Sequence, residues 1–376
     1  MRASIEDLMK TWKELSQKIK NHTESTTLFE IHRDGHCHEA VMWYVHHLTD
    51  DMKKILSIFT VSFALVFSSS AFANKIGVVY DSGGKFDKSF NELAYESALR
   101  VQNELGWDMV EFEASNNTQI EQGMRKIADR GASLIVAMGF AQADSVAAVA
   151  PDYPDTNFVA VDVCWVDDPA SNIYQACYKE HEGSFLVGMI AAMASESGTI
   201  GFVGGMDIPL IRKFQGGYEQ GAQYVNPNIT VLANMTGTTP EAWNNPTKGA
   251  ELTKAQIDGG ADVVYQAAGG TGIGVLQAAA DAGIMGIGVD TNQNWMHPGN
   301  MLTSMLKRLD LTIFEQAQKT EAGTFESGIH ILGLAEGMVG YATEDGMVTS
   351  EMAAAVEAAA AEIVSGSMEV ADWSQE

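Results

Sequence analysis

The sequence is poor in positive charge. It has 23 Lys and Arg residues against 49 Asp and Glu residues, which gives a formal net charge of −26 over 376 residues. A surface with this excess of negative charge repels phosphate backbones and anionic lipid, so neither nucleic acid nor a membrane surface is an expected partner. Hydrophobic residues make up 46% of the chain. That fraction supplies a sizeable core, and the length suits two domains of about 100–200 residues each.

The sequence also lacks the common catalytic signatures. It contains no H-E-x-x-H, no G-x-S-x-G and no Walker loop. The histidines His181, His297 and His330 are scattered, and none lies beside a serine or cysteine in a catalytic pattern. We therefore expect a binding protein that needs no cofactor, and not an enzyme.

No apolar run is long enough to cross a membrane, which takes about 20 residues. The longest candidate, Ile55–Phe67, follows a basic pair that begins at Lys53 and precedes the small-residue site Ala71-Phe72-Ala73. This order is typical of a secretory signal peptide, which we place at 52–73. Residues 1–51 are then an upstream extension. Its one candidate metal cluster matches no standard zinc spacing, so we predict no metal site there: His32, His36, Cys37, His38, His46 and His47.

Cysteine is scarce, with three residues in the whole chain. None stands directly after the expected cleavage site, where a lipid would be attached, so we predict a protein that is free in the periplasm, without a lipid anchor. Cys164 and Cys177 remain after cleavage, and an exported protein can oxidise them to a disulfide. Such a bridge would stabilise the fold by about 3 kcal/mol. The alternative is two free thiols in adjacent strands.

From Asn74 onward, short apolar strands alternate with amphipathic helices, a pattern that predicts parallel sheets. The first series has strands at Lys75–Tyr80, Ser133–Met138 and Phe158–Asp162. The second has strands at Thr199–Val203, Ile229–Met235, Asp262–Ala267, Met285–Val289 and Met301–Leu306. We expect a β-hairpin around Glu336-Gly337 and a last helix at Ser350–Ser365 to end the chain.

Two consecutive α/β series followed by a short tail predict a two-lobed type I periplasmic binding protein with late crossovers between its lobes. We assign 74–180 and about 291–328 to the first lobe. The second lobe takes 181–290 and about 329–376. A ligand is expected in the interlobe cleft, at the carboxyl ends of the strands. A single large Rossmann-like domain is the competing arrangement.

The first polar cluster after a strand runs from Asp81 to Asn91 and contains two glycines that permit a tight turn. Asp87 or Ser89 suits a helix cap. Phe90, in the first turn of the following helix, is unusual for a cap. It is expected either to stack on a heterocyclic ring or to pack in the core.

This cluster resembles the opening motif of the basic membrane protein family of nucleoside-binding lipoproteins. Six further segments resemble the family in the same order, and together the matches run from Lys75 to the mid-330s. They are Gly139-Phe140, Lys179–Phe185, Phe202–Gly205, Gly269–Gly272, Gly288–Asp290 and Thr303–Arg308.

The resemblance implies a purine nucleoside whose base lies between two aromatic rings. Phe90 would be one ring and Trp243 the other, at a place where the family tends to carry phenylalanine, so the preferred base stays open. Asp81 and Asn91 would bind the base edge. Asp290 would accept hydrogen bonds from the ribose hydroxyls, and Lys307 would complete the sugar contacts.

Two glycine segments complete the expected site: Gly139 with Phe140, and Gly269 with Gly270. The spacing of the second departs from the G-x-G-x-x-G fingerprint of dinucleotide-binding proteins, so we expect it to allow close backbone approach to an uncharged ligand. Plainer roles stay open for three site residues. Asp290 would then only cap a turn, Lys307 would be a solvated strand end, and Trp243 would cover the lobe surface.

The resemblance implies an ABC importer's binding protein, a monomer that closes on its nucleoside and docks on a permease in the inner membrane. Rival ligands are a free nucleobase or a flavin. A periplasmic nucleoside hydrolase and a sensory receptor are the rival functions.

Overall fold

The computed structural model describes residues 74–114 and 117–375. Every element below belongs to one compact unit of the chain, Phe72–Glu376. The expected upstream extension at 1–51, with its histidine cluster, and the expected signal peptide at 52–73 lie outside the described residues.

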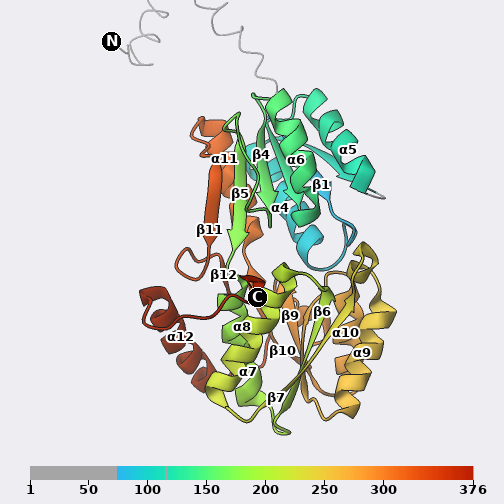
Figure 1. The fold of residues 1–376 in the computed structure, drawn as a ribbon, viewed down its shortest axis with the longest axis vertical. Coiled ribbons are helices and arrows are strands. Elements are labelled where there is room, and N and C mark those ends of the chain that lie inside the picture. The colour runs from blue at the N-terminus through green and yellow to red at the C-terminus, as the bar shows by residue number, and fades with distance from the viewer. Residues whose placement is uncertain (1–73, 115–116, 376) are drawn as a thin grey trace, which may run out of the picture. The chain divides into compact units, whose positions relative to one another are not determined.

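This unit contains two six-stranded sheets (Figure 1). In the first sheet the strand order is β11-β5-β4-β3-β1-β2, and all neighbours are parallel. Its strands are β1 (Lys75–Tyr80), β2 (Asp108–Glu113), β3 (Leu134–Met138), β4 (Asn157–Val161), β5 (Ile173–Tyr178) and β11 (Gly328–Leu332).

The second sheet has the order β12-β10-β9-β8-β6-β7 and is parallel except for the pair β10–β12. Its strands are β6 (Thr199–Met206), β7 (Thr230–Gly237), β8 (Val263–Ala267), β9 (Met285–Asp290), β10 (Met301–Lys307) and β12 (Val339–Tyr341). The predicted α/β class with two mostly parallel sheets is confirmed.

Helices cover both sheets (Figure 1). Those of the first lobe are α4 (Phe90–Leu105), α5 (Asn117–Asp129), α6 (Ala143–Val149) and α11 (Leu309–Ala322). Those of the second lobe are α7 (Glu180–Ala194), α8 (Pro209–Val225), α9 (Pro246–Asp258), α10 (Thr271–Asp281) and α12 (Ser350–Ser365). Prolines and a capping side chain mark where two of these helices begin. Proline opens α8 and α9, and the Asn245 side chain accepts a hydrogen bond from the backbone N–H of Lys248 at the start of α9.

The central strands are buried on both faces, as parallel strands between helices must be. All residues of β3 and β8 are buried. The edge strand β2, by contrast, has no fully buried residue. Its mixed sequence, Asp-Met-Val-Glu-Phe-Glu, gave no strand prediction because half of its surface faces solvent.

The chain passes between the lobes three times, and the predicted boundaries need correction. Residues 291–328 were expected in the first lobe, but β10 pairs with β9 in the second sheet, so the return to the first lobe follows Lys307. Residues 329–376 were expected in the second lobe, but β11 pairs with β5 in the first. The predicted hairpin at Glu336-Gly337 is wrong for the same reason. β11 and β12 belong to different sheets, and Gly333–Met338 joins them.

Cys164 and Cys177 form a disulfide, and the two residues are 13 positions apart. Cys177 lies in β5, and Cys164 lies in the loop between β4 and β5. The bridge therefore ties this loop to the first sheet. Within residues 74–114 and 117–375, no helix has both the length and the apolar character that a membrane span needs. The same residues include no group of three or more His, Cys, Asp or Glu side chains placed to hold a metal ion.

Candidate functional site

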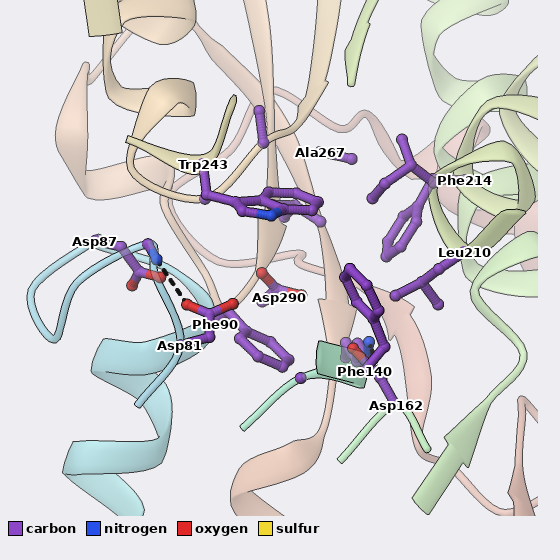
Figure 2. Close-up of a pocket in the computed structure, with 17 residues that line it drawn as sticks. Asp81, Asp87, Phe90, Phe140, Asp162, Leu210, Phe214, Trp243, Ala267 and Asp290 are labelled. Atoms are coloured by element: carbon purple, nitrogen blue, oxygen red, sulfur yellow. Dashed lines mark hydrogen bonds and ion pairs between the residues drawn. The ribbon is translucent and has the colours of Figure 1, made fainter. Parts of the chain in front are cut away.

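A cavity lies where the carboxyl ends of strands from both sheets meet (Figure 2). Asp81 follows β1, Gly139 follows β3, Asp290 ends β9 and Lys307 ends β10. This is the place where ligands bind in open parallel sheets. The residues that line it are Asp81, Gly83, Asp87, Phe90, Gly139, Phe140, Asp162, Leu210, Ile211, Phe214, Trp243, Ala267, Ala268, Gly269, Val289, Asp290 and Lys307.

Phe90 and Trp243 both line this cavity, and Figure 2 shows their rings on different sides of it. Phe90 begins α4 in the first lobe, whereas Trp243 ends a short 3-10 helix, Pro240–Trp243, in the second. The two aromatic faces therefore come from opposite lobes. The plainer role for Trp243, as a cover of the lobe surface alone, does not account for this position.

Two features hold Trp243 in place. Gly205 in β6 lies against its six-membered ring, and a Cβ at that position would overlap the ring. Thr271 holds the adjoining backbone, because its hydroxyl donates to the carbonyl of Ala242 (2.7 Å) and accepts from the N–H of Asn245 (2.7 Å). Gly270 packs behind the same loop, outside the cavity lining, while Gly269 with its φ of 55° lies at the wall.

Asp87 caps the helix that carries Phe90. Its carboxylate accepts from the backbone N–H groups of Ser89 (2.9 Å), Asn91 (3.0 Å) and Glu92 (3.1 Å). Of the two predicted cap residues, Asp87 is therefore the one that acts as the cap. Burial raises the pKa of Asp87 to about 7, although these N–H donors oppose the shift.

Asn91 does not line the cavity and is fully buried. Its amide donates to Asp81 Oδ1 (2.6 Å) and to Asp87 Oδ2 (3.1 Å), and its oxygen accepts from the Asp81 N–H (3.1 Å). A direct contact of Asn91 with the base, as expected from the resemblance, does not fit this arrangement because its polar atoms are already paired. In this structure Asn91 positions Asp81.

Asp290 is 6% exposed and has a φ of 66°. This left-handed conformation is uncommon outside glycine and occurs most readily in Asp and Asn. Asp290 Oδ2 accepts a hydrogen bond from the Ser89 hydroxyl (2.5 Å). Burial raises the pKa of Asp290, although Lys307 opposes the shift. The carboxylate is thus held at the cavity wall and does more than cap a turn.

Lys307 is only 1% exposed, so its interpretation as a solvated strand end is wrong. Its ammonium lies 2.6 Å from Asp162 Oδ1 and 3.0 Å from Glu180 Oε1. Burial lowers the pKa of Lys307, but Asp162 and Glu180 outweigh that effect and raise it above its usual value. Lys307 also faces the Phe90 ring, with 5.3 Å between the ammonium and the ring centroid.

The acids around Lys307 join the two lobes. Asp162 follows β4 in the first lobe, Glu180 begins α7 at a crossover, and Lys307 ends β10 in the second lobe. Glu180 also pairs with Lys213 (3.2 Å), whose ammonium donates to the carbonyl of Tyr178 (2.9 Å). Burial raises the pKa of Asp162 to about 6, while Lys307 acts in the opposite direction.

Sequence reasoning missed part of the lining. Asp162 was predicted only as the end of a strand, although an acid at that position follows the same rule that identified Asp81 and Asp290. Leu210 and Phe214 gave no signal, since they are ordinary apolar residues of α8. Of the expected site residues, those that line the cavity are Asp81, Phe90, Gly139, Phe140, Trp243, Gly269, Asp290 and Lys307.

Comparison with known proteins identifies relatives of this arrangement. The family Bmp, described as ABC transporter substrate-binding protein PnrA-like, matches residues 73–374. Basic membrane protein A2 of Borrelia garinii subsp. bavariensis is 31% identical over 77% of this chain and 86% of the relative. An uncharacterized lipoprotein of Pyrococcus furiosus is 33% identical over 73% of this chain and 71% of the relative.

A solved structure gives a similar result. The crystal structure of an ABC transporter solute-binding protein from Aeropyrum pernix K1 is 27% identical, with a TM-score of 0.72. The similarity covers 80% of this chain and 93% of that protein. The expected two-lobed periplasmic binding fold is therefore confirmed.

Proposed function

The chain belongs to the Bmp family of PnrA-like ABC transporter substrate-binding proteins, and on that premise we propose that its ligand is a purine nucleoside. The observation that carries the proposal is the presence of two aromatic rings, Phe90 and Trp243, on different sides of one cavity. Stacking of a base on an aromatic side chain contributes about 1–3 kcal/mol per base. A flat heterocycle between these rings would stack on both lobes at once, and the stacking energy would favour the closed arrangement of the lobes.

Asp290 and Lys307 would bind the sugar. Asp290 Oδ1 accepts no hydrogen bond from the described residues, so it is available to a ribose hydroxyl. The Lys307 ammonium has three protons, and its two carboxylate partners leave donor capacity for a sugar oxygen. Hydrogen bonds to charged groups contribute about 1.5–3 kcal/mol each. A free nucleobase would leave both groups unused, which favours the nucleoside over the base.

Binding would be coupled to transport through closure of the lobes. In this proposal the nucleoside joins the two lobes, and the closed protein docks on the permease of an ABC importer. Export through the segment 52–73 would place the protein in the periplasm. The Pyrococcus relative is named a lipoprotein, whereas this sequence has no cysteine directly after Ala73, so we propose a mature protein without a lipid anchor. Mass spectrometry of the exported protein should find an unmodified N-terminus at Asn74.

Isothermal titration against a panel of nucleosides, nucleobases and flavins tests the ligand assignment. We expect purine nucleosides to bind, with weaker binding by Phe90→Ala and Trp243→Ala. Phe86→Ala is the matched control, since Phe86 is 60% exposed and does not line the cavity. Absence of heat with every purine nucleoside at micromolar protein would refute the assignment.

The same samples separate binding from catalysis. Long incubation of protein with nucleoside should leave the nucleoside intact. Free base and ribose in the mixture would identify a nucleoside hydrolase. If Asp290→Ala binds the preferred ligand as well as the original protein does, the ligand makes no use of that carboxylate, and a free base replaces the nucleoside.

A further inference from the structure

The two oxygens of the Asp81 carboxyl group have different surroundings. Oδ1 accepts two hydrogen bonds, from the Gly83 N–H (2.8 Å) and from the Asn91 amide (2.6 Å). Oδ2 accepts none from the described residues. It lies beside Gly139 at the cavity wall, 3.4 Å from the place that a Cβ on that glycine would occupy. One oxygen is thus fixed by the protein, and the other is left to the ligand.

The charges around Asp81 are mostly negative. The Asp87 and Asp290 carboxyl groups line the same cavity, and Asn91, between Asp81 and Asp87, is neutral. The cations nearby are paired with other acids. Lys307 pairs with Asp162 and Glu180, Lys85 with Glu111, and Lys88 with Glu92.

Neighbouring acids and burial both disfavour the ionised form of a carboxyl group. Burial raises the pKa of Asp81, and the hydrogen bonds from Asn91 and Gly83 oppose this only in part. The protonated form of Asp81 is therefore easier to reach than that of an exposed aspartate, and a ligand that needs this form can shift the carboxyl group toward it. An ionised carboxylate only accepts hydrogen bonds, whereas a protonated one can also donate.

Purine bases also differ in whether the ring nitrogen N1 donates or accepts a hydrogen bond. The ring nitrogen N1 carries a proton in the 6-oxopurines and donates it. In the 6-aminopurines N1 has no proton and accepts. An ionised Oδ2 facing an accepting ring nitrogen would leave two buried acceptors opposed without a proton, an arrangement that is costly in a desolvated site.

We propose that Asp81 binds the base edge in two protonation states, ionised for a base that presents a ring N–H and protonated for a base that presents a ring nitrogen acceptor. Binding of the second class then takes up one proton from solvent, and binding of the first does not. The inference rests on the proposed nucleoside function and adds to it a rule for the choice of base. The site accepts both purine classes, and pH sets the preference between them.

Titration calorimetry of the intact protein measures the proton uptake directly. Adenosine and inosine are each titrated in two buffers of different ionisation enthalpy, from pH 5.5 to 8.5. We expect adenosine to take up as much as one proton, so that its affinity falls as pH rises, by about tenfold per pH unit at most. Inosine should take up no proton and should release up to one, so that its affinity falls as pH decreases.

Asp81→Asn provides the variant arm, because an amide both donates and accepts but does not titrate. The two pH slopes should become equal in this variant. Asp87→Asn is the matched comparison. Burial raises the pKa of Asp87 to about 7, within the pH range of the titration, but its carboxylate accepts hydrogen bonds from the helix backbone. If the difference between adenosine and inosine persists in Asp81→Asn and disappears in Asp87→Asn, the inference is wrong.

The outcomes also separate this inference from the proposed function. Equal proton exchange for the two nucleosides overturns the role of Asp81 and leaves nucleoside binding intact. If neither nucleoside binds at any pH, the proposed function itself fails. The buffer comparison uses the unmodified protein, so the conclusion holds even if a variant does not fold.

Discussion

Ser89 and Asp290 form a hydrogen bond between the lobes, with 2.5 Å between the serine hydroxyl and the carboxylate. Ser89 precedes α4 in the first lobe, and Asp290 ends β9 in the second. A second bond joins the same regions, from the Gln293 amide to the carbonyl of Lys88 (2.8 Å). The described structure is therefore a closed arrangement, in which the carboxylate assigned to the sugar also holds the lobes together.

Ser89→Ala should shift the protein toward an open form. The variant loses a hydrogen bond to a charged group, which contributes about 1.5–3 kcal/mol and corresponds to about tenfold to one-hundredfold weaker ligand binding. Small-angle scattering without ligand should give a larger radius of gyration. Ser82→Ala, at an exposed position in the same loop, is the control. Equal scattering and affinity in the two variants would show that the bond does not contribute to closure.

Gly205→Ala should weaken ligand binding through the displacement of Trp243. The added Cβ would overlap the indole ring, so the ring must leave its position at the cavity wall. Gly340→Ala is a matched control, because Gly340 lies in another strand of the same sheet and a Cβ there would contact nothing. Titration calorimetry and tryptophan fluorescence should change in the first variant only. Normal binding by Gly205→Ala would mean that the position of the indole ring is not needed.

Lys307→Met should destabilise the fold by about 3–5 kcal/mol near neutral pH, because Asp162 would keep a buried charge without a partner. The loss should shrink as pH falls toward 5, where Asp162, whose pKa is raised to about 6, becomes protonated. Urea denaturation at pH 5 and pH 8 measures both values. Lys319→Met removes an ion pair with Glu315 on the surface of α11 and should cost less than about 1 kcal/mol. A pH-independent loss in Lys307→Met would contradict this account.

The cap residue Asp87 should make stability depend on pH. Burial raises its folded-state pKa from 3.8 to about 7, so the folded protein binds the proton more tightly than the unfolded chain. Stability from this group is then complete below about pH 4 and is lost as pH rises to about 7. The difference in unfolding free energy between the original protein and Asp87→Asn should therefore fall over this range and stay constant above it. If this difference in unfolding free energy does not change with pH, the pKa of Asp87 lies near its ordinary value.

The disulfide between Cys164 and Cys177 should be present in exported protein. Mass spectrometry with and without reductant should show a difference of two hydrogens. Cys177→Ser should lower the free energy of unfolding by about 3 kcal/mol, and reductant should lower that of the original protein by a similar amount. Equal masses in the two samples would establish free thiols.

The sequence allowed prediction of most elements because central strands and helices have strong patterns. Strands such as β3 and β8 are short continuous apolar runs, and prolines mark the starts of α8 and α9. The sheet to which a strand belongs was harder to predict. β10 was predicted as a strand and pairs with the preceding strand β9, but no local signal shows that the chain returns to the first lobe only after it. β11 was not predicted as a strand, and its partner β5 is distant in sequence.

The candidate site shows the same limit. Phe90 and Asp290 could be predicted because residues after strands share one edge of the fold, whereas Trp243 was expected only from the resemblance to the basic membrane protein family. The role of Asn91 could not, since it depends on which donors and acceptors its neighbours leave free. Phe214 could not be predicted as a lining residue, because nothing in the sequence of α8 indicates that this helix borders the cavity.

The three crossovers also determine what can be cut from this protein. A fragment that ends near Tyr178 would contain five strands of the first sheet but lack β11 and α11. The edge of β5 and the face of α4 that packs on α11 would both be uncovered. Neither lobe is a continuous piece of sequence. We therefore expect that neither lobe can be produced alone by truncation. Replacement of one continuous segment by that of a relative should not exchange a whole lobe either.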